Sequence, residues 1–306
     1  MQNPGVLIIA GPTASGKTEL ALALAEAFDA EIVGADSRQI YCGMTIGTAA
    51  PSADQRARVR HHLVEFLDPH ERYSAARFTI DALAAIEDAA ARGKRTIVAG
   101  GTGFYVRTLA GDVTLAAEHD DAVRRRLARE ARVHPHEVLH AWLAALDPAR
   151  AAAIDPADPY RVSRALEIAL VGRGAAGPQA ATRTLPSLKN RSIAVRKLYL
   201  APAADELARR IEARVDRMLA AGFLEEAERV GGDAVAADAV GYREALAYLQ
   251  GRMTLEELRD RLSRATRRYA KRQATWFRTE PDLLSIPTSD AYRAAVSAAR
   301  EIPGWA

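Results

Sequence analysis

The feature that most constrains the fold is a glycine-rich stretch near the start of the chain. It reads Gly11-Pro12-Thr13-Ala14-Ser15-Gly16-Lys17-Thr18 and fits the pattern G-x-x-x-x-G-K-[ST]. An apolar run, 6–10, precedes it, and a segment rich in Ala and Leu with helical spacing, 17–28, follows it. A buried strand, a tight loop and a helix, in this order, are the context that the pattern requires.

The chemistry of this loop follows from its backbone. Its N–H groups and the N-terminus of the following helix form a site for anions. Lys17 adds a positive charge for phosphate oxygens, and Thr18 offers a hydroxyl ligand for Mg²⁺. The sequence therefore predicts that residues 11–18 bind a diphosphate or the phosphates of a nucleotide, without indicating that ATP is hydrolysed.

Further apolar runs predict strands that alternate with helices. The runs are 31–35, 95–99 and 197–200, and an Ala-rich helix is expected at 81–92. This order predicts an α/β fold, a P-loop NTPase-like core with a parallel sheet. Ligands of such sheets bind at the carboxyl ends of the strands, where residues 11–18, Asp36-Ser37 and residues 100–103 all fall.

The middle and the end of the chain have a helical pattern instead. Residues 121–170 show helical spacing only, residues 172–188 are rich in Gly, Ala and Pro and predict a loop, and the pattern after Pro202 is helical to about Arg278. We interpret this as a helical insertion and a helical C-terminal region added to the core. The predicted divisions are 1–118 for the first part of the core, 119–188 for the insertion, and 189–306 for core completion with a basic helical region.

Composition narrows the class of protein. The one cysteine, Cys42, excludes a disulfide framework and favours a reducing cytoplasm. We interpret its side chain as a small apolar group, since nothing nearby in sequence resembles an activating environment. No apolar run approaches the roughly 18 residues of a membrane span, and the N-terminus has no basic leader. A cytoplasmic protein without a membrane partner is the expectation.

Positive charge is concentrated late in the chain. The net charge is only +3, but residues 252–278 hold nine Lys and Arg residues against three acidic ones. A basic stretch on a helix can follow a phosphate backbone, or it can be an ordinary solvated helix face. The stretch alone leaves both interpretations open.

A second motif points to different chemistry. His136-Glu137-Val138-Leu139-His140 fits H-E-x-x-H, the zinc-protease helix pattern. Catalytic zinc needs a third protein ligand, and the longer form of the motif fails because Leu143 and Ala144 stand where it needs a Gly. We interpret the two histidines as surface residues of an amphipathic helix.

Together the motifs resemble the bacterial tRNA dimethylallyltransferases, also called tRNA isopentenyltransferases. The resemblance runs from about Val6 to Arg278, and it departs at Arg38-Gln39, at Asp155 and in residues 172–186. The segments that carry it are the loop 11–18, Asp36-Ser37-Arg38-Gln39-Ile40-Tyr41, residues 46–49, His61-His62-Leu63, Tyr73-Ser74-Ala75, residues 100–105, residues 158–167, Val240-Gly241-Tyr242-Arg243-Glu244, and residues 271–278.

The resemblance implies a reaction. The N6 amine of adenine 37 in a tRNA anticodon stem-loop attacks C1 of dimethylallyl diphosphate, and diphosphate leaves. It implies Mg²⁺ as cofactor, a monomer, and tRNAs with an A36-A37-A38 run as substrates. The catalytic residues implied are Asp36 as the acceptor of the amine proton, Arg214 on the diphosphate, and Thr102 as a residue that forms a hydrogen bond at the diphosphate or the reacting centre.

The resemblance also implies a set of tRNA contacts. Arg and Tyr side chains among them suit phosphate contact and base stacking, although Arg124-Arg125-Arg126 also fits a solvated helix face. The implied contacts are Asp36, Ser37, Arg38, Gln39, Thr102, Arg124, Tyr160, Arg161, Val162, Ser163, Arg164, Gly241, Tyr242, Arg243, Glu244, Ala245, Leu246, Lys271, Arg272, Gln273, Ala274, Thr275, Trp276, Phe277 and Arg278.

Three other functions share some of these features. An adenylate isopentenyltransferase acting on free AMP or ATP would use the loop, Asp36 and Thr102, but would not need the basic segment or the helical insertion. A small-molecule P-loop kinase would consume ATP. A non-catalytic RNA-binding protein would not need Lys17, Thr18 and Asp36 intact.

Overall fold

The computed structural model describes residues 5–113, 115–116, 120–174, 182–183 and 185–305. The chain divides into two compact units, one made of Met1–Asp112 with Pro186–Ala306 and the other of Val113–Leu185. The first unit is thus built from both ends of the chain. The second begins and ends a few residues earlier than the insertion expected at 119–188.

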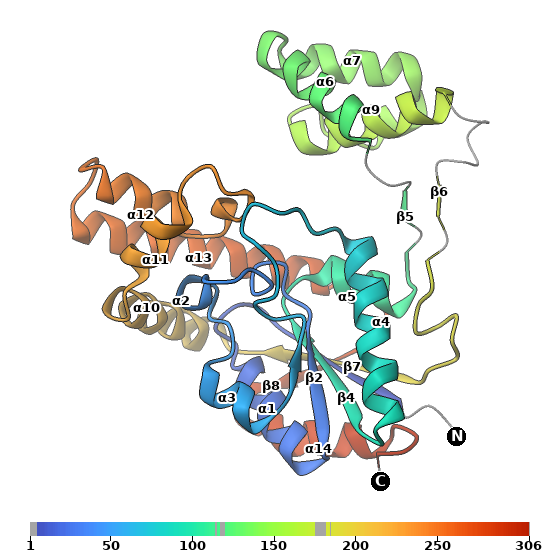
Figure 1. Cartoon of the computed structure of the whole chain (residues 1–306), viewed down its shortest axis with the longest axis vertical. Coiled ribbons are helices and arrows are strands. Elements are labelled where there is room, and N and C mark those ends of the chain that lie inside the picture. The colour runs from blue at the N-terminus through green and yellow to red at the C-terminus, as the bar shows by residue number, and fades with distance from the viewer. Residues whose placement is uncertain (1–4, 114, 117–119, 175–181, 184, 306) are drawn as a thin grey trace. The chain divides into compact units, whose positions relative to one another are not determined.

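A six-stranded sheet forms the centre of the first unit (Figure 1). The strand order is β3-β2-β4-β1-β7-β8, and each described pair is parallel. The α/β class and all four predicted strands are therefore confirmed. The strands are β1 (Val6–Ala10), β2 (Ala30–Gly34), β3 (His61–His62), β4 (Arg95–Gly100), β7 (Val195–Ala201) and β8 (Leu283–Pro287).

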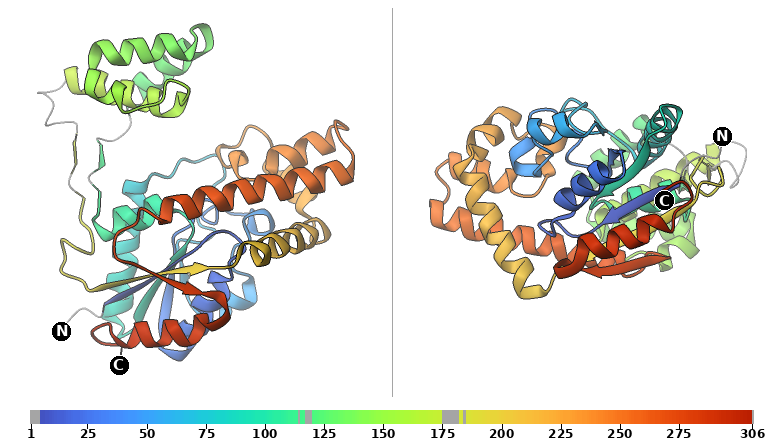
Figure 2. Two further views of the ribbon diagram at one scale, coloured as in Figure 1. Left: turned by 180° about the vertical axis from the view of Figure 1, so that it is seen from behind. Right: turned by 90° about the horizontal axis from the view of Figure 1, so that it is seen from below.

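Helices cover both faces of this sheet (Figure 2). On one face, α1 (Lys17–Ala27) and α14 (Ala291–Arg300) pack against side chains such as Leu7 and Ile9. On the other, α4 (Ala75–Ala91) and α5 (Gly103–Ala110) pack against Ile8 and its neighbours. The residues of β1 are buried on both faces, which explains why this strand is a continuous apolar run.

Sequence patterns missed parts of this layer arrangement. The helix expected at 81–92 begins six residues earlier, at Ala75, because the Ser74 side chain caps it by accepting the N–H of Arg77 at 3.1 Å. Strand β8 and helix α14 were not predicted. They close one edge of the core, where the buried Trp305 donates its indole N–H to the carbonyl of Gly5 at 2.7 Å.

The helical region expected from Pro202 to about Arg278 is confirmed and packs as a group. It shares a hydrophobic cluster with the short helix α2 (Thr45–Thr48) and the segment around it. Its helices are α10 (Ala204–Ala220), α11 (Phe223–Val230), α12 (Tyr242–Leu249) and α13 (Leu255–Phe277).

The second unit is a small helical bundle with a core of its own. Leu127, Leu143, Val162 and Leu166 lie at its centre. Residues 172–188 were predicted to be a loop, and this holds for 185–188 but is wrong for 172–174 and 182–183. Helix α9 runs on to Gly174, and β6 (Thr182–Arg183) pairs antiparallel with β5 (Leu115–Ala116), whereas 175–181 and 184 lie outside the described residues. The helices are α6 (Asp121–Val133), α7 (His136–Leu146), α8 (Pro148–Ala152) and α9 (Pro159–Gly174).

The H-E-x-x-H motif lies on α7 of this bundle. The Nε2 atom of His140 is 3.0 Å from the carbonyl oxygen of Ala151 and 3.2 Å from that of Ile154. A ring nitrogen that faces two carbonyl oxygens acts as a donor, so it is not available as a metal ligand. Among the described residues, no helix is both long and apolar enough to cross a membrane.

Candidate active site

Three neighbouring strands deliver the predicted site residues to one edge of the sheet. Asp36 follows β2, Thr102 follows β4, and the glycine-rich loop follows β1. The connections bond to one another, since the N–H of Thr102 donates to the carbonyl of Ala35 at 3.1 Å and the N–H of Ser37 donates to Thr102 Oγ1 at 2.9 Å. A Cβ on Gly100 would lie 2.0 Å from the Ala35 oxygen, so only glycine fits there.

The glycine-rich loop has the backbone of an anion site. Ala14 and Gly16 both have positive φ, at 64° and 92°. Positive φ is strained for alanine, and such strain is characteristic of ligand-binding loops. The hydroxyl of Ser15 is buried and has no hydrogen-bond partner among the described residues. A buried donor without a partner is rare, and here it suits a bound oxyanion.

Lys17 begins α1 and reaches back over the loop. It is only 9% exposed, and its Nζ atom lies 3.4 Å from the Pro12 carbonyl. Burial lowers the pKa of Lys17, and the negative charge of Asp36 partly offsets that effect. A buried lysine beside a loop of N–H groups suits this site to an anion.

A cavity of about 890 Å³ lies in front of the loop and is lined by Ala14, Ser15, Gly16, Lys17 and Thr18. Helix α10 supplies three arginines to its wall, Arg210, Arg214 and Arg217. Their spacing of four and then three residues places them on one face of the helix. Of these three, only Arg214 was identified from the sequence. The helical spacing of Arg210 and Arg217 relative to it was a signal that could have identified them too. Arg210 also donates to the Ser15 carbonyl at 2.8 Å, which holds the loop.

A smaller cavity of about 160 Å³ adjoins Asp36 and is lined also by Thr13, Arg38, Arg214 and Tyr269. The N–H of Arg38 donates to Asp36 Oδ1 at 3.0 Å, and no described residue donates to the other carboxyl oxygen. Burial raises the pKa of Tyr269, and the charge of Asp36 adds to the effect. Sequence reasoning did not find Tyr269, because nothing in its local pattern distinguishes it from a core residue.

Arg214 lines both cavities. Its Nη1 donates to the Thr13 hydroxyl at 2.8 Å, and its Nη2 donates to the Gly47 carbonyl at 3.1 Å. Burial lowers the pKa of Arg214, whereas the charge of Asp36 raises it. The guanidinium is therefore held in a fixed orientation where the two spaces meet.

Gln273 of α13 supports the loop from behind. Its Oε1 accepts the N–H of Thr13 at 2.8 Å, and its Nε2 donates to the carbonyl of Gly101 at 3.0 Å. Gln273 is 5% exposed, and both ends of its amide are used in these bonds. Its role in this structure is therefore to support two strand-end loops, whereas the sequence had suggested a tRNA contact.

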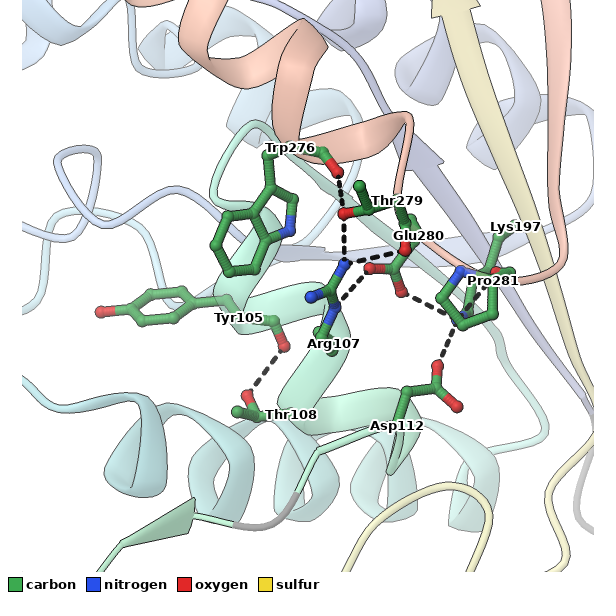
Figure 3. A network of polar contacts seen from close by, with 9 residues as sticks. All are labelled: Tyr105, Arg107, Thr108, Asp112, Lys197, Trp276, Thr279, Glu280 and Pro281. Atoms are coloured by element: carbon green, nitrogen blue, oxygen red, sulfur yellow. Dashed lines mark hydrogen bonds and ion pairs between the residues drawn. The ribbon is translucent and has the colours of Figure 1, made fainter. Parts of the chain in front are cut away.

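A network of charged groups holds the end of α13 against the core (Figure 3). Lys197 of β7 pairs with Asp112 and, at 2.9 Å, with Glu280. Arg107 of α5 donates to Glu280 at 2.9 Å, and its guanidinium carbon lies 4.5 Å from the centre of the Trp276 ring. Glu280 is fully buried and shared by the two cations. The network ties the helix that carries Gln273 to both β7 and α5.

Several other predicted tRNA contacts also have buried side chains. Val162 belongs to the core of the second unit, whereas Tyr242, Ala245 and Phe277 belong to cores of the first. Their apolar surface is used in packing, so these side chains do not face solvent in this structure. Gly241 is buried as well.

The remaining predicted contacts fall into two groups. In the first unit, the exposed ones on α13 are Lys271, Arg272 and Thr275. Arg278, which directly follows α13, and Arg243 of α12 are exposed as well. The partly buried ones are Ser37, Gln39, Glu244, Leu246, Ala274 and Trp276. In the second unit, Tyr160 is 74% exposed, and Arg124, Arg161, Ser163 and Arg164 are exposed or partly buried. Arg161 pairs with Asp158 at 3.3 Å and Arg164 with Glu167 at 2.8 Å.

One cluster among the described residues has the composition of a metal site away from the cavities. It consists of Glu31, His62 and Asp88. Its acids are already neutralised, because Arg92 pairs with both Glu31 and Asp88. His62 lies 2.7 Å from Glu31. We interpret the cluster as a structural ion network of the sheet.

The fold and site define a class of protein: a P-loop α/β protein whose glycine-rich loop suits a diphosphate or polyphosphate group. The carboxyl group of Asp36 lies at the end of β2, which is separated from β1 by one strand, β4. Comparison with known proteins is more specific. The family model described as IPP transferase matches residues 39–280. The chain therefore belongs to the IPP transferase family.

Curated relatives agree over nearly the whole chain. The tRNA dimethylallyltransferase of Anaeromyxobacter dehalogenans (strain 2CP-C) is 49% identical over 292 residues, which cover 92% of this chain and 94% of the relative. That of Geobacter sulfurreducens is 43% identical over 281 residues, covering 90% and 89%.

Solved structures are similar over 97% of this chain. The full-length tRNA isopentenylpyrophosphate transferase of Bacillus halodurans is 34% identical to this chain, with a TM-score of 0.69, and the match covers 96% of its length. A eukaryotic dimethylallyltransferase acting on tRNA is 26% identical with a TM-score of 0.76 and is covered to 77%.

Proposed function

We propose that this protein transfers the dimethylallyl group of dimethylallyl diphosphate to N6 of adenine 37 in tRNA, with release of diphosphate. The reaction is that of its family: relatives matching nine-tenths of the chain or more are named tRNA dimethylallyltransferases. The chain is thus an enzyme, a prenyltransferase that modifies tRNA.

The observation that carries the assignment of roles is the position of Arg214 in the walls of both cavities. The larger cavity presents the glycine-rich loop and Lys17, which suit the diphosphate. The smaller one presents Asp36 together with apolar surface from Met218 and Leu262, which suits the allyl group and the amine that attacks it. The scissile C1–O bond then lies next to the Arg214 guanidinium.

The residues on the phosphate side stabilise the leaving group. As the C1–O bond breaks, its electron pair leaves with the diphosphate, whose charge grows. Lys17, Arg214 and the N–H groups of the loop are fixed before the reaction and act in a partly dehydrated site, where such interactions are strongest.

The carboxyl group on the other side accepts the proton. When the N6–C1 bond forms, the amine must lose one proton, and an Asp36 oxygen is the acceptor that we assign. The N–H of Arg38 orients one of its oxygens. Thr102 lies beside it, because its hydroxyl accepts the N–H of the neighbouring Ser37 at 2.9 Å. We assign Thr102 to hydrogen bonding at the reacting centre.

The donors beside Lys17 fit Mg²⁺. The Thr18 hydroxyl lines the larger cavity, and hydroxyl and phosphate oxygens are the ligands that this hard cation prefers. We propose that Thr18 holds Mg²⁺ together with the diphosphate. When bound, the ion supplies neutralising charge to the leaving group.

For the tRNA we propose contacts with its anticodon stem-loop through exposed basic and aromatic side chains. In the first unit these are Lys271, Arg272 and Arg278 of α13 and its end, and in the second Tyr160 and Arg161. Extrusion of a loop base costs less than extrusion from a duplex. We expect a monomer acting in the cytoplasm, where its tRNA substrate is found.

Nucleoside mass spectrometry tests the function directly. Unmodified tRNA incubated with protein, Mg²⁺ and dimethylallyl diphosphate should yield N6-dimethylallyladenosine. Transfer to free AMP but not to tRNA would instead indicate an adenylate isopentenyltransferase. Release of ADP from ATP without tRNA would indicate a kinase, and absence of any turnover would indicate an RNA-binding protein.

A further inference from the structure

A buried carboxyl group outside both cavities organises a short helix at their border. Glu226 of α11 is 2% exposed. Its Oε2 accepts the N–H of Ile46 at 2.9 Å, and its Oε1 accepts the N–H of Gly47 at 2.7 Å. These are N–H groups of the first turn of α2, which have no partner within the helix. Met44 at the N-cap position has no side chain able to bond them, so Glu226 acts as a cap supplied from another helix.

Close packing removes the remaining freedom of α2. A Cβ on Gly47 would lie 2.6 Å from a ring carbon of Phe223 and 2.6 Å from the hydroxyl of Tyr242. That hydroxyl donates to Glu226 Oε1 at 2.7 Å, which gives the carboxyl group a third hydrogen bond. The contacts with Phe223, Tyr242 and Glu226 consequently fix the position of the Gly47 carbonyl group.

This fixed carbonyl is the one that Arg214 bonds. Its oxygen accepts Nη2 of Arg214 at 3.1 Å, while Nη1 bonds Thr13 Oγ1 at 2.8 Å. We propose that Glu226 is a positioning residue for the transfer reaction: it holds α2, so that the Gly47 carbonyl orients the Arg214 guanidinium between the two cavities. The inference rests on the function proposed above. The proposal also gives the segment 240–244 a role in the reaction, because Tyr242 of this segment bonds Glu226.

The test is a double-mutant cycle between Glu226 and Arg214. Glu226→Gln keeps the size of the side chain, but its amide nitrogen cannot accept an N–H. We expect the single-turnover rate to fall about tenfold to a hundredfold, with the KM for tRNA within about twofold, because a displacement of the order of 1 Å is enough for such a loss. In an Arg214→Ala background the same substitution should change the rate by less than about twofold.

A purely structural role for Glu226 makes a different prediction: it lowers the melting temperature and reduces the rate by the same factor in both backgrounds, and this outcome overturns the proposal. An unchanged rate in Glu226→Gln overturns it too. Glu228→Gln, an exposed acid on the same helix, is the matched control.

A milder substitution covers the case in which Glu226→Gln does not fold. Tyr242→Phe removes one of the three hydrogen bonds to the carboxyl group and leaves both backbone bonds in place. It should lower the rate less, and again only when Arg214 is present; an equal loss without Arg214 overturns the proposal. The proposed function is tested by whether the protein without substitutions forms the product. The role of Glu226 is tested by the differences between variants, so the two can fail separately.

Discussion

Replacing Gln273 by Met tests whether α13 holds the glycine-rich loop, residues 11–18, in place. Met has nearly the same length as Gln but can neither accept the N–H of Thr13 nor donate to the carbonyl of Gly101. Both backbone groups lose their partner in a buried setting, and each buried group left unpaired costs about 1–3 kcal/mol. We expect a total loss of roughly 2–6 kcal/mol, part of it in the free energy of unfolding and part in the order of the loop.

Two measurements separate these parts. Calorimetric titration with inorganic diphosphate in the presence of Mg²⁺ should show a Kd raised about tenfold or more, because 1.4 kcal/mol of loop disorder is enough for that factor. The melting temperature should fall by several degrees. Arg261→Gln, an exposed change on the same helix, is the control. If Gln273→Met matched this control in both measurements, the support that we assign to Gln273 would be refuted.

Four further outcomes are expected. Asp36→Asn should lower the single-turnover rate by roughly a hundredfold or more at near-normal tRNA affinity; a normal rate would remove Asp36 from the mechanism. Lys17→Met should weaken binding of dimethylallyl diphosphate, and calorimetry with unchanged affinity would contradict the phosphate role. Hydrogen bonds from Arg92 and, to a smaller extent, from His62 lower the pKa of Glu31 to about 2 from 4.5. Stability present above pH 4.5 should therefore be lost as pH falls towards 2, and Glu31→Gln should abolish that part of the acid sensitivity in unfolding measurements. Affinity for tRNA should fall steeply with salt, and Arg272→Gln should reduce the slope by about one; a flat dependence would exclude dominant phosphate contacts.

The core of the site could be predicted because its parts are local in sequence. The loop 11–18 carries its own geometry and chemistry, and each of Asp36 and Thr102 directly follows a recognisable buried strand. The rule that parallel strands bring their carboxyl ends together then placed them at one edge. Arg214 was found only through the resemblance, because the spacing of the arginines on α10 shows a shared helix face but not that this face lines the cavity.

The supporting contacts could not be predicted, because they join positions far apart in the chain. Gln273 bonds Thr13 across 260 residues, and Glu226 bonds Gly47 across 179. Neither periodicity nor composition specifies which element lies beside which loop. The exposed β8 was missed for a different reason: of its five residues only Ile286 is buried, so its pattern does not resemble an inner strand.

Helical spacing explains why one segment was assigned to tRNA as a whole although only part of it faces solvent. On α13, Gln273 and Phe277 are four residues apart and point into the protein, whereas Arg272 and Thr275 between and beside them are exposed. A matching motif cannot separate the two faces of the helix, because it is defined along the chain. In the function proposed above, the exposed face presents charge to the tRNA, whereas the buried face bonds the N–H of Thr13 in the glycine-rich loop. On that proposal, a shift of α13 on binding tRNA would move the Gln273 amide, and with it the part of the glycine-rich loop that Thr13 belongs to.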